Sequence, residues 1–102
     1  PYEMAKDIEL HYQNVLFIVF RLTGLYTQVE YHTSRGRIDM VVQTADYVYV
    51  MEFKLDGSAE QALEQIEERQ YDLPFAKDRR KVFKIGVNFS SETRNIDLWI
   101  VK

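Results

Sequence analysis

Residues 36–55 read GRIDMVVQTADYVYVMEFKL, and this stretch decides the fold of the chain. It is rich in β-branched and aromatic residues, which favour strands, and the turn-like residues 44–46 divide it into two runs. We therefore expect two strands, over residues 37–43 and 47–55, that pair as a hairpin.

The charged residues of this hairpin sort onto one face of the predicted sheet. Because side chains alternate along a strand, Glu52 and Lys54 share a face, and Asp39 lies on the opposite face of its strand from its apolar neighbours. Pairing Asp39 with Glu52 also pairs Ile38 with Phe53, Met40 with Met51 and Val42 with Tyr49. A slip of one residue would mix acidic and apolar groups on both faces, so the hydrophobic pattern supports the carboxylate pair. The connecting loop then needs an even length or a bulge.

Such a pair of carboxylates has a specific chemical use. Two carboxylates on one face repel each other unless a cation lies between them, and hard oxygen ligands favour Mg²⁺ or Mn²⁺. A bound cation would lower the pKa of a coordinated water and clamp phosphate oxygens, while the Lys54 ammonium could orient that water. The pattern therefore predicts a divalent-metal site for phosphodiester hydrolysis, formed by Asp39, Glu52 and Lys54.

The remaining elements follow from periodicity and capping. Apolar residues recur at helical spacing between residues 2 and 23, which predicts a first helix there. Ser58 with Gln61 is a capping-box pattern that opens a second helix ending near Gln70. Further strands are expected over residues 25–32, 83–89 and 96–100, which gives the order αβββαββ and one mixed sheet flanked by helices.

Composition bounds the class of protein. A chain of 102 residues, 46% of them apolar, suits one domain over residues 1–102, and because it begins at Pro1 we expect a fragment of a longer protein. The absence of cysteine excludes thiol nucleophiles and zinc–thiolate sites and fits a cytoplasmic location. No apolar run approaches the roughly 20 residues of a membrane span. The net charge of −3 counts against tight, non-specific nucleic-acid binding by this domain alone.

Three segments together resemble the PD-(D/E)XK nuclease superfamily: Gly36-Arg37-Ile38-Asp39, Glu52-Phe53-Lys54, and the following helix with Gln65 and Tyr71. Ile38 stands where the superfamily's name has proline, a departure that leaves the ligand chemistry unchanged. More narrowly, residues 9–13 also make the chain similar to the nuclease-like C-terminal domain of bacterial AAA-type ATPase-like proteins. The resemblance implies a restriction-endonuclease-like αβββαβ core, linked in the parent chain to an N-terminal ATPase-like domain.

The resemblance also implies a role for each site residue. The implied catalytic residues are Asp39, Glu52, Lys54, Glu9 and Gln65. Asp39 and Glu52 would bind Mg²⁺ or Mn²⁺ together with the carbonyl of Phe53, Lys54 would activate water, and Glu9 would be an accessory acid. The implied partner is nucleic acid, DNA in preference to RNA, and an interface on the first helix would fit a homodimer.

Two alternatives stay open beside the metal site. Glu52 and Lys54 could instead be solvent-facing strand residues in an ion-pair network with Arg37 and Asp39. The domain could also be a catalytically inactive nuclease-like module for interaction or regulation within a larger ATPase-like protein, which the negative net charge favours. The basic residues 79–81 are interpreted as a solvated turn.

Overall fold

The structure is a computed structural model that describes the backbone of residues 26–33, 36–90, 92–93 and 95–102, and most side chains from Met40 onward. The helix predicted over residues 2–23, which carries Glu9, lies outside these ranges. Within them, no helix is both long enough and apolar enough to cross a membrane.

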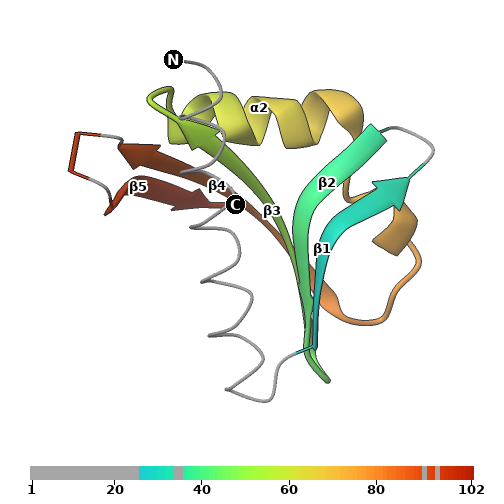
Figure 1. The fold of residues 1–102 in the computed structure, drawn as a ribbon. Helices are drawn as coiled ribbons and strands as arrows, with labels where there is room; N and C mark the ends of the chain where they lie inside the picture. Colours follow the sequence, from blue (N-terminus) through green and yellow to red (C-terminus); the bar gives the residue numbers. More distant parts are fainter. Residues whose placement is uncertain (1–25, 34–35, 91, 94) are drawn as a thin grey trace.

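The described chain folds as a sheet with one α-helix. Its elements are β1 (Tyr26–Thr33), β2 (Gly36–Gln43), β3 (Tyr47–Leu55), α2 (Ala59–Arg69), a 3-10 turn (Leu73–Phe75), β4 (Lys81–Ser90) and β5 (Asn95–Val101). The five strands lie in the order β1-β2-β3-β4-β5, and α2 covers one face of the sheet (Figure 1). β3 and β4 are parallel neighbours connected through α2, and the other neighbours are antiparallel. The predicted α/β class with a mixed sheet is confirmed, and each predicted strand differs from the observed one by at most two residues at either end.

The hairpin of β2 and β3 has the predicted register, with Met40 opposite Met51 and Val42 opposite Tyr49. The four residues between Gln43 and Val48 form the expected even-length loop. The described pairs run from Gln43–Val48 to Met40–Met51, and continuing this register would bring Asp39 opposite Glu52. Figure 1 shows β2 and β3 diverging toward the carboxyl end of β3, where β3 stays paired with β4 through Leu55.

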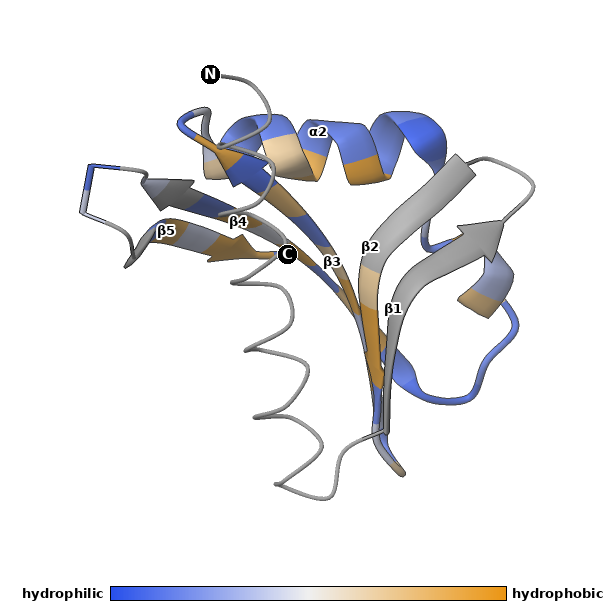
Figure 2. Cartoon of the chain, viewed as in Figure 1, coloured by the Kyte–Doolittle hydropathy of each residue, from blue (hydrophilic) through white to orange (hydrophobic). Residues whose placement is uncertain are grey.

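Alternation along the strands divides the core into two clusters. On the α2 side, Val48 and Val50 pack with helix residues such as Ile66, while Met51 and Phe53 face the opposite side with Met40. Figure 2 shows the matching pattern on α2, whose apolar residues face the sheet and whose hydrophilic residues face outward. Glu52 and Lys54 alternate with Met51 and Phe53, so they share a face with Val48 and Val50, as predicted, and this face lies under α2.

The start and the close packing of α2 have separate local causes. Ser58 is the N-cap, its side chain accepts a hydrogen bond from the amide of Gln61, and the side chain of Gln61 returns the contact to the amide of Ser58. This confirms the predicted capping box. Gly86 of β4 lies directly beneath the helix, where a Cβ atom would come within 2.3 Å of the carbonyl oxygen of Ala59. A side chain at position 86 would therefore force α2 away from the sheet.

The basic residues before β4 have a structural role. The Arg80 guanidinium contacts both carboxylate oxygens of Asp78, the carbonyl of Thr44 and the side chain of Gln43 at 2.7–3.1 Å. Arg79 donates to the carbonyl of Ala45. The two arginines thus connect the loop before β4 to the β2–β3 turn. Arg79 is exposed, as expected for a solvated turn, whereas Arg80 is half-buried and hydrogen-bonded, so the interpretation as a solvated turn is wrong for Arg80.

Candidate functional site

Glu52 and Lys54 lie near the carboxyl end of β3, beneath α2. The Glu52 residue is only 4% exposed, whereas Lys54 is half-buried. Burying a carboxylate costs free energy unless polar or charged groups surround it. A buried acid beside a lysine is therefore the first sign that this part of the sheet has a chemical purpose, although Val48 and Val50 of the same strand face are ordinary core residues.

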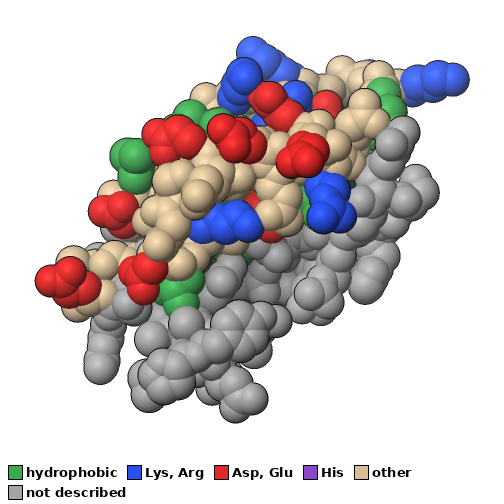
Figure 3. Space-filling model, turned by 90° about the horizontal axis from the view of Figure 1, so that it is seen from above, with side chains coloured by type: hydrophobic (Ala, Val, Ile, Leu, Met, Phe, Trp, Pro, Cys, Tyr) green, Lys and Arg blue, Asp and Glu red, His purple; other side chains and the backbone are tan. Residues whose placement is uncertain are grey.

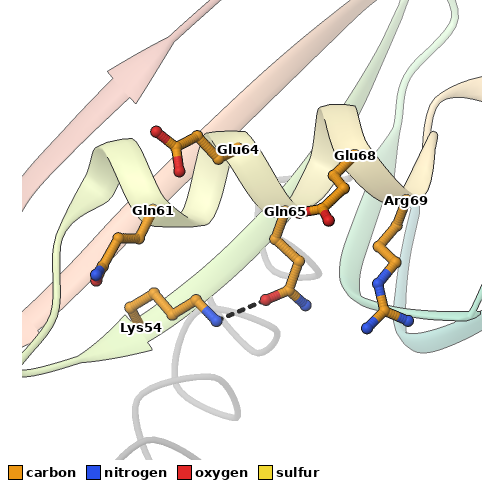
Figure 4. Close-up of a pocket in the computed structure, with 6 residues that line it drawn as sticks. All are labelled: Lys54, Gln61, Glu64, Gln65, Glu68 and Arg69. Atoms are coloured by element: carbon orange, nitrogen blue, oxygen red, sulfur yellow. Dashed lines mark hydrogen bonds between the residues drawn. The ribbon is translucent and has the colours of Figure 1, made fainter.

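Gln65 of α2 connects these two side chains. Its Oε1 accepts a hydrogen bond from Lys54 Nζ at 2.6 Å, and its Nε2 donates to Glu52 Oε1 at 2.8 Å. Figure 4 shows Gln65 pointing down from α2 toward the end of the Lys54 side chain. Glu52 and Lys54, which the strand pattern placed in one site, and Gln65, which the family resemblance added, thus form one hydrogen-bonded chain.

Tyr71 also contacts the Gln65 side chain. Its hydroxyl lies 3.4 Å from Gln65 Nε2, and the residue is 3% exposed. Gln70 ends α2 in the left-handed conformation with φ 53°, and the amide of Tyr71 then donates to the carbonyl of Ile66. This reversal turns the chain back under the helix, which explains how Tyr71 reaches Gln65 although six positions separate them.

Sequence reasoning missed Asn88, which holds the loop after Lys54. Asn88 lies opposite Lys54 in the β3–β4 ladder and is 4% exposed. Its Oδ1 accepts from the amide of Gly57 at 3.0 Å, and its Nδ2 donates to Asp97 at 3.2 Å. The available signal was an asparagine between two apolar residues, Val87 and Phe89, on the same strand face as Gly86.

An open pocket of about 330 Å³ adjoins this hydrogen-bonded chain. It lies between the end of β3 and one side of α2, and its polar lining is shown in Figure 4. The lining residues are Lys54, Gln61, Glu64, Gln65, Glu68 and Arg69. Two predicted site residues, Lys54 and Gln65, thus face a space that a ligand can enter.

A metal ion at this site would need oxygen ligands from the side chains and backbone nearby. Among the described residues there is no group of three or more His, Cys, Asp or Glu side chains that could hold an ion. The side chain of Asp39 and the whole of Glu9 lie outside the described part, and Phe53 points its ring into the far core cluster. The oxygen donors named by the pattern, two carboxylates and one carbonyl, fit Mg²⁺ or Mn²⁺, since Mg²⁺ commonly keeps several waters and needs few protein ligands.

Comparison with known proteins points to one family. A sequence model described as the PD-(D/E)XK nuclease superfamily matches residues 7–99 of this chain. The chain is also 33% identical over 96 residues to a protein of Azotobacter chroococcum mcd 1 whose name is "Uncharacterized protein in vnfD 5′ region". That match covers 92% of this chain but only 19% of the relative, so the chain spans about a fifth of the length of that protein.

Proposed function

The chain belongs to the PD-(D/E)XK nuclease superfamily, and we propose that it is a metal-dependent nuclease domain that hydrolyses phosphodiester bonds in nucleic acid. The observation that carries the proposal is the contact chain from buried Glu52 through Gln65 to Lys54, at 2.8 and 2.6 Å, beside an open pocket. An ordinary surface ion pair would need neither a buried carboxylate nor an amide held between the two charges.

The proposed metal ligands are Asp39, Glu52 and the carbonyl of Phe53. The register of β2 and β3 supports this assignment, because Asp39 and Glu52 are the next positions after the Met40–Met51 pair. A bound Mg²⁺ or Mn²⁺ would supply charge neutralisation at the phosphate and a more acidic water. Glu9 remains a proposed accessory acid.

Lys54 has a separate proposed task. Its ammonium can donate hydrogen bonds to the attacking water and to a phosphate oxygen, and its charge offsets the negative charge that grows in the transition state. Gln65 restricts where the ammonium lies, since it accepts one of the three protons of Nζ and leaves the others for the reacting groups. Preorganised charge of this kind costs no reorganisation when the reaction occurs.

A second candidate is a catalytically inactive nuclease-like module, and two acidic residues of the pocket favour it. Glu64 and Glu68 line the same space as Lys54 and would repel a nucleic-acid backbone. We propose that the domain works inside a longer protein, with an ATPase-like domain on its N-terminal side and other parts contributing to nucleic-acid binding. DNA is the preferred substrate in this proposal.

Calorimetric titration of Mg²⁺ and Mn²⁺ tests the proposal directly. Wild type, Asp39→Asn and Glu52→Gln should be titrated and then incubated with labelled DNA and RNA. We expect metal binding and metal-dependent cleavage in the wild type, and the loss of both in the two variants. A folded wild-type protein that binds neither ion and cleaves neither substrate would favour the inactive module.

A further inference from the structure

The pocket beside Lys54 extends one helical turn further along α2, to Arg69. Figure 4 shows Gln65 and Arg69 pointing from the same side of the helix, in the direction where the Lys54 ammonium lies. Positions 65 and 69 are about 6 Å apart along the helix axis. That distance is of the same order as the separation of successive phosphates in a nucleic-acid strand.

The Arg69 guanidinium is available for a ligand. On a helix the ion-pair partners of residue 69 toward the N-terminus would be residues 65 and 66, and these are Gln65 and Ile66, which carry no charge. Within the described residues Arg69 forms no salt bridge, and its side chain is exposed. A position in the last turn of α2 explains why a cation is tolerated there but not why it lines the pocket.

Two acidic residues at or near the end of α2 are paired with lysines outside the pocket lining. Glu67 contacts Lys102 at 2.7 Å, and Asp72, beyond the end of the helix, contacts Lys84 at 3.6 Å. Figure 3, which looks down on α2, shows acidic side chains gathered over the helix with basic side chains beside them. The pocket lining contains two basic residues, Lys54 of β3 and Arg69 of α2.

We propose that Arg69 binds a backbone phosphate of the nucleic acid, next to the phosphate that is attacked at Lys54. A guanidinium suits this role because it can donate two parallel hydrogen bonds to phosphate oxygens. The inference rests on the proposed nuclease function and adds the path of the substrate, which runs along the pocket side of α2. Glu68 lines the same path and opposes binding by repulsion.

The salt dependence of DNA binding tests this assignment. Fluorescence anisotropy with a labelled single-stranded oligonucleotide, in Ca²⁺ in place of Mg²⁺, should compare wild type with Arg69→Gln, Arg69→Lys and Glu68→Gln. Loss of one phosphate contact lowers the slope of log K against log salt by about 0.7. We expect that loss and about 5–10-fold weaker binding for Arg69→Gln, a wild-type slope for Arg69→Lys, and tighter binding for Glu68→Gln.

Lys77→Gln is the matched control, because Lys77 is an exposed cation outside the pocket and its loss changes net charge equally. If Arg69→Gln and Lys77→Gln have the same slope as the wild type while DNA is still bound and cleaved, the Arg69 assignment is wrong and the nuclease proposal stands. If the wild type neither binds nor cleaves DNA, the nuclease proposal and the assignment both fail.

Discussion

The side chain of Gln65 meets two opposite requirements, because a carboxamide offers an acceptor oxygen and a donor nitrogen at once. Lys54 needs an acceptor and Glu52 needs a donor, and the amide lies between them at 2.6 and 2.8 Å. A carboxylate at position 65 would serve the lysine but repel Glu52, and an ammonium would do the reverse. Glutamine is therefore a residue type that holds both charges in place.

Gln65→Ala should lower the rate of phosphodiester cleavage by about 10–100-fold, the usual cost of removing a residue that orients a metal ligand. Because Gln65 acts through Glu52 and Lys54, kcat should fall while the Kd for DNA changes little. Tyr71→Phe is the graded control, since it removes only a long contact of 3.4 Å and should change kcat by less than about threefold. Equal kcat values for Gln65→Ala and wild type would contradict the positioning role.

Asn88→Asp should destabilise the domain by about 1 kcal/mol, because it places a carboxylate 3.2 Å from that of Asp97 where the amide now donates. The contact with the amide of Gly57 would be kept. Adding Asp97→Asn restores a donor with its direction reversed, so the double variant should regain most of the loss. Urea unfolding of the four proteins measures the coupling, and additive effects would show that the two residues do not interact.

At the scale of elements, the contact between α2 and β4 determines where the site residues lie. Gly86 pairs with Glu52 across the β3–β4 ladder, and the backbone of α2 rests on it at Ala59 and Leu63. The helix thus approaches the sheet beside the buried acid. That close approach is what lets Gln65 reach Glu52 and Lys54 from above.

Gly86→Ala should cost about 1–3 kcal/mol, because its Cβ would lie 2.3 Å from a backbone carbonyl oxygen that cannot move without the helix. Cleavage should fall as well, since Gln65 would move with α2. Gly57→Ala is the comparison, because its Cβ would meet the side-chain oxygen of Gln61 at 2.7 Å, so it should cost the single capping contact of Gln61 with the Ser58 amide without displacing the helix backbone. Urea midpoints that are equal for the two variants would argue against this account of the helix position.

The contact between Arg80 and Asp78 should make stability depend on pH in acid. Hydrogen bonds from Arg80 hold the pKa of Asp78 below its ordinary value of 3.8. A depressed pKa means that the contact stabilises the fold above pH 3.8 and that this contribution is lost as pH falls toward the folded-state value. When the pH is lowered from 5 to about 2, the midpoint of thermal unfolding should therefore fall less for Asp78→Asn than for the wild type. Parallel curves for the two proteins would show that Asp78 is not a source of the acid sensitivity.

For the whole molecule, the core and the proposed metal site are separate. Two apolar clusters, one on each face of the sheet, hold the described fold together. The net charge of −3 gives the chain little long-range attraction for a polyanion. Folding and metal loading can therefore be measured independently.

Mg²⁺ should raise the thermal midpoint of the wild-type domain, because an ion that binds only the folded state stabilises it by about 2.7 kcal/mol at 100 times its Kd. Glu52→Gln, which keeps the size of the side chain, should abolish the shift. EDTA should stop cleavage and leave the circular dichroism spectrum unchanged. If the protein cleaves nucleic acid but Mg²⁺ does not change its thermal midpoint, the ion binds with the substrate and not to the free protein.

Features that depend on neighbouring residues could be predicted from the sequence. The alternation in residues 47–55 assigned Glu52 and Lys54 to one face, and the apolar pairs set the hairpin register that the structure shows. The capping box at Ser58 marked the start of α2. These signals are local, because strand period, cross-strand pairing and helix capping act over a few residues.

Tertiary structure alone decided which distant residues meet. The backbone of α2 packs directly on Gly86, and Asn88 contacts the amide of Gly57, 31 positions away. Arg69, in the last turn of α2, lines the pocket beside Lys54. Such contacts depend on the distance and angle at which α2 packs on the sheet. That geometry arises from many small packing terms at once, so no single stretch of the sequence encodes it.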